Sequence, residues 1–131
     1  ATAILTVGET FDPACVKVVC DQRMRALYFS RAPIPWARDE WATDKTVLPA
    51  SPILRHLGLY AYRASTLRHF SRLPQSPLER TESLEQLRLL ENGLPIAVRL
   101  APEPIPPGVD TEEDVERVEA VLTGVAGRVR R

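Results

Sequence analysis

Side chains that could bind a small anionic ligand occur in four separate places along the chain. They are Arg31 and Arg38, then His56 and Tyr60, then Glu85 and Gln86, and finally Asp110. Arginine offers a planar fork of donors that matches a carboxylate, whereas His, Tyr, Glu and Gln side chains hydrogen-bond hydroxyl groups. The carboxylate of an aspartate is a hard oxygen ligand for a divalent cation. Together these residue types suit an acidic sugar.

Each of these residues also has a purely structural explanation. Arg31 and Arg38 fit solvated loop arginines, and Glu85 fits a solvent-facing helix glutamate. Asp110 stands beside Thr111 and could cap a helix that begins there. The sequence alone leaves both explanations open. It contains no glycine-rich phosphate loop, no Cys/His spacing for zinc and no Gly-x-Ser-x-Gly elbow.

The segment 55–63 is predicted to be a strand with one polar and one apolar face. Alternation with a period of two places His56, Gly58, Tyr60 and Tyr62 on one face and Leu57, Leu59 and Ala61 on the other. The first face combines an imidazole, two phenols and a glycine that lets a ligand approach, which indicates a polar pocket. The alternative is a half-buried strand whose polar face is simply wet.

The remaining pattern predicts strands interleaved with helices. Strands are expected at 2–7, 16–20, 26–30 and 95–100, and helices at 64–73, 77–91 and from Thr111 onward. The strands at 16–20 and 26–30 form a hairpin, and Ser76, Pro77 and Glu79 begin a helix that Asn92 and Gly93 end. Four prolines and two tryptophans make 31–52 an ordered loop docked on an apolar surface. The fold class is therefore α/β or α+β with at least one antiparallel pair.

The amino-acid composition narrows the classes of partner that this chain is expected to bind. The chain has 131 residues, enough for one domain with its own core, and its 17 basic residues balance 17 acidic ones. We therefore expect neither nucleic acid nor an anionic membrane surface as a partner. There is no run of about 18 apolar residues and no signal peptide at the start of this sequence. Cys15 and Cys20 are expected to point to opposite faces and to stay unpaired, which fits a reducing cytoplasm.

Four stretches carry a resemblance to a known family: VKVVCDQRMRALYFSRAPIPWARD, RHLGLYAYR, SPLERTESLEQLRLLENG and PPGVDTEEDVERV. In this order and spacing they resemble the C-terminal half of the 3-deoxy-manno-octulosonate (Kdo) cytidylyltransferases, from about Ala1 to about Leu122. The resemblance implies a three-layer α/β sandwich around a mixed sheet, of which 1–131 would be a single domain or half-domain. Arg23 and Met24 replace the glycine usual in the hairpin turn, so the turn conformation stays open.

The resemblance also implies an activity. It is the transfer of a cytidylyl group from CTP to Kdo with magnesium, giving pyrophosphate and CMP-Kdo for lipopolysaccharide biosynthesis in the cytoplasm. Arg31, Arg38, His56, Tyr60, Glu85 and Gln86 would line the Kdo site, and Asp110 would bind Mg²⁺. The hairpin and the loop at 31–52 would form a homodimer contact. Because the family's phosphate-binding loop and second metal-binding aspartate are not in this chain, the alternative is a noncatalytic fragment that only binds an acidic sugar or self-associates.

Overall fold

The computed structural model describes residues 1–103, 105, 112, 115–116, 118–120 and 122–123. The elements are β1 (Thr2–Ala3), α1 (Val7–Phe11), β2 (Lys17–Cys20), β3 (Ala26–Ser30), α2 (Arg38–Thr43), β4 (Leu54–Arg55), α3 (Ala64–Phe70), α4 (Pro77–Glu82) and α5 (Leu87–Glu91). Helices and an antiparallel sheet are thus combined in one chain, in agreement with the predicted α/β class. None of the helices in the described part has the length and apolar run that a bilayer crossing requires.

The sheet has the strand order β1-β4-β2-β3, and every neighbouring pair is antiparallel. The predicted hairpin is present as β2 and β3, with a register shift between Val19 and Cys20. Its turn needs no glycine because Met24 itself adopts the left-handed conformation, with φ of 57°. The carboxylate of Asp21 accepts hydrogen bonds from the backbone N–H groups of Arg23 and Arg25, which stabilises this turn. Both cysteines are free thiols, as expected.

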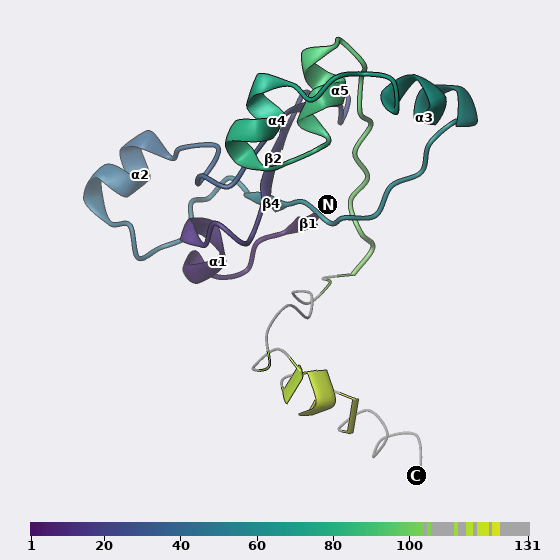
Figure 1. Cartoon of the computed structure of the whole chain (residues 1–131). Coiled ribbons are helices and arrows are strands. Elements are labelled where there is room, and N and C mark those ends of the chain that lie inside the picture. Colours follow the sequence, from purple (N-terminus) through teal and green to yellow (C-terminus); the bar gives the residue numbers. More distant parts are fainter. Residues whose placement is uncertain (104, 106–111, 113–114, 117, 121, 124–131) are drawn as a thin grey trace.

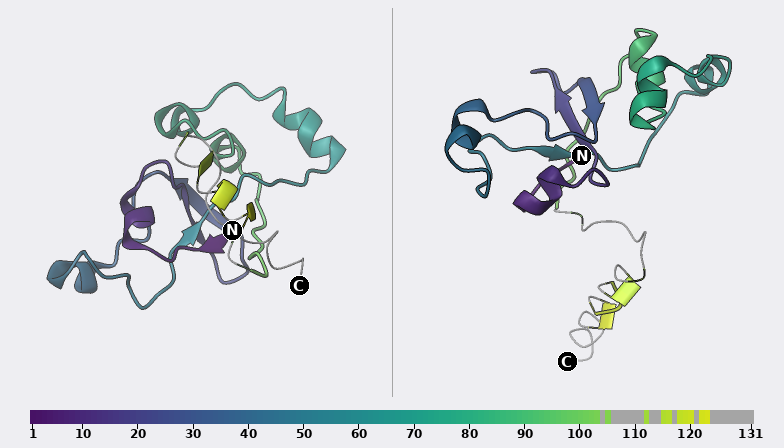
Figure 2. Two further views of the ribbon diagram at one scale, coloured as in Figure 1. Left: turned by 90° about the horizontal axis from the view of Figure 1, so that it is seen from below. Right: turned by 60° about the vertical axis from the view of Figure 1, so that its left-hand side comes forward.

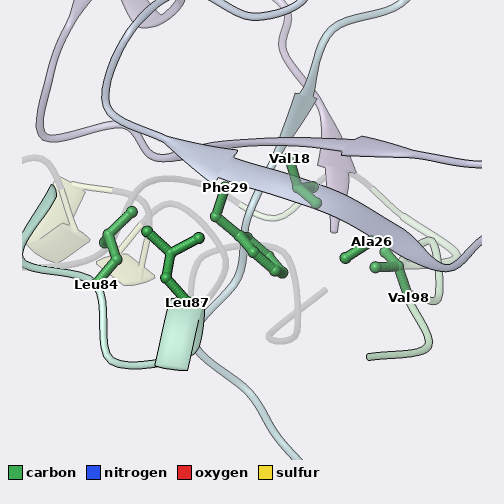
Figure 3. Close-up of a cluster of buried hydrophobic side chains, with 6 residues drawn as sticks. All are labelled: Val18, Ala26, Phe29, Leu84, Leu87 and Val98. Carbon is green, nitrogen blue, oxygen red and sulfur yellow. The ribbon is translucent and has the colours of Figure 1, made fainter. Parts of the chain in front are cut away.

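Two apolar clusters hold the sheet to its surroundings. In the larger one, Leu84 and Leu87 pack against Val18, Ala26 and Phe29 of the hairpin, together with Val98 (Figure 3). In the smaller one, Trp41 of α2 packs with Ile4 and Ile53. In the view of Figure 1, α4 and α5 overlap the hairpin, while α2 extends to the left beyond the sheet.

The strand predicted at 2–7 is wrong beyond its first residues, because a helix begins at Val7. The side-chain Oγ1 of Thr6 accepts a hydrogen bond from the backbone N–H of Glu9 at 3.2 Å and caps α1. Thr6 and Glu9 have the Thr-x-x-Glu spacing of a capping box, a signal of a helix start that outweighs the β-branched residues before it.

The helix predicted at 77–91 is interrupted. Its start is correct, since Ser76 precedes the helix and its backbone N–H donates to the carboxylate of Glu79 at 3.1 Å, as in the predicted capping box, and its end at Asn92 and Gly93 is also correct. Between them Ser83 has φ of 53° and ψ of 50°, so α4 ends and α5 begins only at Leu87. Leu84, in the turn, and Leu87, at the start of α5, both lie in the core cluster with the sheet.

Three further predictions need correction. The loop at 31–52 docks through Trp41, which is 2 % exposed, but it contains the helix α2. The strand expected at 95–100 is reduced to a single antiparallel bridge between Ala97 and Arg25. The helix at 64–73 ends at Phe70. The predicted start of the last helix, Thr111, lies outside the described residues, although those described between 112 and 123 are helical.

Candidate functional site

His56 and Tyr60 come together directly after β4. The hydroxyl of Tyr60 lies 2.8 Å from Nε2 of His56, and the ring of Tyr62 stacks on that of Tyr60 at 5.6 Å between centroids. His56 also packs edge-on against Phe29 of β3 at 5.1 Å. The sheet thus anchors the imidazole, and the imidazole anchors the two phenols.

The predicted strand at 55–63 is nevertheless wrong, because β4 ends at Arg55. In a strand, residues four apart are about 13 Å apart, too far for the His56–Tyr60 hydrogen bond. The chain instead bends at Gly58, where the N–H of Leu59 donates to the carbonyl of Leu57 at 2.7 Å. The predicted apolar face is not a core face, since Leu59 is 83 % exposed.

This cluster borders a cavity of about 830 Å³. Its lining includes His56, Tyr60 and Tyr62, Phe29 and Val18 of the sheet, and the segment 94–102. Most of the lining is apolar, and its polar side chains are the imidazole, the two phenols, Thr66 and the arginines Arg63 and Arg99. This is the usual composition of a small-molecule site. The volume is ample for a sugar acid.

Glu85 supplies a negative charge close to this aromatic cluster. Burial is the main cause that raises the pKa of both Tyr60 and Tyr62, and the carboxylate of Glu85 raises both further. Burial, followed by the N-terminal ammonium of Ala1, lowers the pKa of His56, while Glu85 acts in the opposite direction. At neutral pH the site therefore contains neutral phenols and a neutral imidazole, groups that can both donate and accept hydrogen bonds.

A pH-dependent stability follows from the lowered pKa of His56. Below the ordinary histidine value of about 6.5 the unfolded chain binds a proton that the folded chain binds only at lower pH. We expect the contribution of His56 to the free energy of unfolding to be complete above about pH 6.5 and to be lost as the pH falls through the lowered pKa. Urea unfolding at pH 7.5 and pH 5 checks this. The stability difference between the parent and His56→Gln should shrink at pH 5, and a difference that does not change with pH would refute the prediction.

Gln86 and Glu85 lie in the turn between α4 and α5, not on a helix as predicted. Glu85 is exposed, whereas Gln86 is only 2 % exposed and its amide Nε2 has no hydrogen-bond partner within the part of the chain that the structure describes. An unpaired buried donor is costly, so this amide is a natural site for a ligand acceptor. A second cavity, of about 340 Å³, adjoins Glu85 and Ser83.

Arg31 directly follows β3 and reaches the same turn. Its guanidinium donates to the backbone carbonyls of Glu82, Pro13 and Ser83 at 2.7, 2.9 and 3.4 Å. It is therefore an ordered arginine and not a solvated loop residue. Three of the five N–H groups of its guanidinium are engaged in this way.

The structure does not bring Arg38 to this cluster. Arg38 is the exposed first residue of α2, and Figures 1 and 2 place α2 and α3 at opposite ends of the molecule, with the His56 segment leading to α3. Asp110 lies outside the described residues. Within the described ranges no group of three or more His, Cys, Asp or Glu side chains could hold a metal ion.

Two polar residues near the site were not found from the sequence. Lys17 is fully buried in β2, and its ammonium donates to the carbonyls of Asp12 and Arg31, both at 2.8 Å. Glu82 accepts hydrogen bonds from Tyr28, Ser30 and Arg31. For Lys17 the signal was available, since a lysine inside the apolar run Val16–Cys20 must find partners if the strand is buried. For Glu82 no such signal exists in the sequence, because its hydrogen-bond partners are about 50 residues away along the chain.

Comparison with known proteins assigns the family. A model of the cytidylyltransferase family matches residues 1–100. A 3-deoxy-manno-octulosonate cytidylyltransferase of Stenotrophomonas maltophilia (strain R551-3) is 51 % identical over 129 residues, which are 98 % of this chain and 50 % of the relative. One of Xanthomonas campestris pv. campestris (strain 8004) is 52 % identical over 123 residues, 93 % of this chain and 49 % of the relative.

A solved structure agrees with these matches. It is CMP:2-keto-3-deoxy-manno-octonic acid synthetase in complex with CTP, which has a TM-score of 0.80 and 41 % identity, and the match covers 94 % of this chain and 47 % of that one. The chain spans about half the length of the relatives it matches. The resemblance carried by four sequence stretches is thereby confirmed, and the chain belongs to the cytidylyltransferase family.

Proposed function

We propose that this chain forms the sugar-binding half of an enzyme that transfers a cytidylyl group from CTP to Kdo, giving CMP-Kdo and pyrophosphate for lipopolysaccharide biosynthesis. The observation that carries the proposal is the His56–Tyr60 hydrogen bond at the rim of the cavity, within electrostatic reach of Glu85. The curated relatives are named for this transfer, and the solved relative is complexed with CTP.

The proposed roles follow from the chemistry of each side chain. His56, Tyr60, Glu85 and Gln86 hydrogen-bond the sugar hydroxyls, and the arginines Arg31 and Arg38 pair with its carboxylate. Neither arginine is among the residues that line the 830 Å³ cavity. Arg31 has the stronger support because its guanidinium reaches the carbonyl of Ser83, just before Glu85 and Gln86, whereas Arg38 lies on α2. In the reaction the anomeric oxygen forms a bond to the α-phosphorus, the bond to the bridging oxygen breaks, the hydroxyl proton is lost and pyrophosphate leaves.

Magnesium is part of the proposal through the family. Cytidylyltransferases typically use a divalent metal, which neutralises charge on the transferring phosphate when it is bound. Asp110 is the proposed ligand from this chain, and its surroundings lie outside the described residues. The role of the residues that the structure describes is to bind and orient the sugar. Orienting the sugar raises the effective concentration of its attacking hydroxyl beside the phosphate.

A homodimer in the cytoplasm also stays a proposal. Leu27 of the hairpin is 62 % exposed and Trp36 of the following loop is 52 % exposed, although Trp36 packs edge-on against Trp41 at 4.9 Å. Such apolar surface is consistent with a contact between two copies. The second candidate function is a noncatalytic fragment that binds an acidic sugar or self-associates, which the half-length match favours.

The sugar-binding role is tested in a joined enzyme, defined as this chain fused to the part of the Stenotrophomonas maltophilia relative that it does not match. We expect His56→Ala to weaken Kdo binding about tenfold, the effect of one lost hydrogen bond in a desolvated site. Titration calorimetry with Kdo measures this. His69→Ala is the matched control, because His69 is exposed on α3. Equal affinities of the two variants would remove His56 from the site, and absence of Kdo binding by the parent would refute the proposed function.

A further inference from the structure

Glu82 connects the end of the hairpin to the turn that carries Glu85 and Gln86, and no sugar-binding role accounts for its contacts. We propose that Glu82 is a positioning residue for the sugar site: it holds Arg31 and the Glu85–Gln86 turn in one fixed arrangement. This inference rests on the proposed function.

The carboxylate of Glu82 binds three groups at the end of β3. One oxygen, Oε1, accepts from the hydroxyls of Ser30 at 2.7 Å and Tyr28 at 3.3 Å. The other, Oε2, accepts from the backbone N–H of Arg31 at 3.0 Å. Both oxygens are therefore used to fix the strand exit from which Arg31 projects.

The side chain of Arg31 makes a reciprocal contact with the end of α4. Its guanidinium donates to the carbonyls of Glu82 and Ser83, at the end of α4. The last carbonyls of a helix have no partner inside it, and a cation close to them also interacts favourably with the helix dipole. Arg31 thus caps the C-terminal end of α4. Glu82, the last residue of that helix, in turn accepts a hydrogen bond from the backbone N–H of Arg31.

Lys17 completes the fixation of Arg31 from the other side. Its buried ammonium donates to the carbonyl of Arg31 at 2.8 Å. The N–H, the carbonyl and the guanidinium of Arg31 are all hydrogen-bonded to groups of other segments. An arginine held in this way loses little further freedom when it meets an anion, and that is the physical basis of preorganisation.

The turn that follows Ser83 is located by the same contacts. Ser83 adopts the left-handed conformation, which a non-glycine residue enters only when its surroundings compensate the cost. The carbonyl of Ser83 receives the guanidinium of Arg31, and Glu85 and Gln86 come directly afterwards. Loosening Glu82 should therefore displace three proposed sugar ligands together.

The negative charge of Glu82 matters for this arrangement. Burial, the largest single influence, raises the pKa of Glu82, but hydrogen bonds from the Arg31 N–H and from the hydroxyls of Ser30 and Tyr28 outweigh it, so the pKa is lowered. A glutamine at this position would lose the negative charge, and with its Oε1 on the Arg31 N–H it would turn its N–H groups toward the hydroxyls of Ser30 and Tyr28. These hydroxyls donate to Glu82 and would have to accept instead, because an amide cannot accept with both of its polar atoms.

The test is Glu82→Gln in the joined enzyme, followed by pyrophosphate release. We expect the KM for Kdo to rise about tenfold or more, as for loss of a charge-assisted hydrogen bond, while kcat and the KM for CTP change less than about threefold. Ser30→Ala removes the 2.7 Å hydrogen bond to Glu82 together with the acceptor of the Ala32 N–H at 3.0 Å, and it should raise the KM for Kdo about threefold. It decides the question if Glu82→Gln does not fold.

The matched control is Glu79→Gln. Glu79 is a buried glutamate of the same helix, but its carboxylate binds Arg88 and the Ser76 N–H and not the hydroxyls and the N–H that Glu82 binds at the end of β3. We expect this variant to lower thermal stability without changing the KM for Kdo. If Glu82→Gln and Glu79→Gln behave alike, Glu82 is merely structural and the inference is overturned. If the parent shows no Kdo-dependent turnover, the proposed function fails instead.

Discussion

Joining this chain to the unmatched part of the Stenotrophomonas maltophilia relative is expected to raise Kdo-dependent pyrophosphate release at least about a thousandfold over that of the isolated chain, a change of about 4 kcal/mol in the activation barrier. The chain contributes the proposed sugar ligands, but it spans about half the length of the relatives. In the described ranges it has no cluster of side chains that could hold a metal. Phosphoryl transfer depends mainly on positioning the reactants and on neutralising phosphate charge. A chain that supplies only the sugar ligands should therefore give little of the rate of the joined enzyme.

Continuous measurement of pyrophosphate with CTP, Kdo and magnesium checks this prediction. The unmatched part of the relative alone, and the two halves mixed without fusion, are the controls for activity that does not need this chain. Chelation of magnesium should abolish the signal of the joined enzyme. Robust release from the isolated chain would show that catalysis resides in these residues, and it would refute the half-site proposal.

Leu87→Ala is expected to lower the free energy of unfolding by about 2 to 5 kcal/mol, the range for truncating a fully buried leucine. Leu87 has no exposed surface and lies in the cluster with Phe29 and Val18 that joins α5 to the sheet (Figure 3). The loss has two parts: the transfer of the removed methyl groups, and a cavity between helix and sheet that neither can close without moving the hairpin.

Urea unfolding followed by circular dichroism measures this change. Leu78→Ala is the matched control, because it is the same substitution at a leucine of α4 whose side chain is 39 % exposed. We expect its cost to stay below about 1 kcal/mol, as for surface positions. Equal costs at Leu78 and Leu87 would mean that the cluster under α5 does not hold the two layers together.

Local chemistry determines much of this fold. The hairpin, the capping box at Ser76 and the helix end at Gly93 are all correctly predicted from the sequence, because each depends on residues within a few positions of one another. The resemblance carried by four separate stretches identifies the family as well, and the comparisons confirm it.

Tertiary structure decides the remaining features, since their partners are distant in sequence. The sequence pairs His56 and Tyr60 on a strand face that does not exist. They meet because the chain bends at Gly58, and Phe29 packs edge-on against His56. Ser83 ends α4 where helical periodicity continues, and its carbonyl accepts from the guanidinium of Arg31, a residue far away in sequence. A pattern along the chain records the local preferences of its residues. It does not record the burial and the long-range hydrogen bonds that override those preferences, and in this chain these forces bring Glu82 to Arg31 and place the turn that carries Glu85 and Gln86.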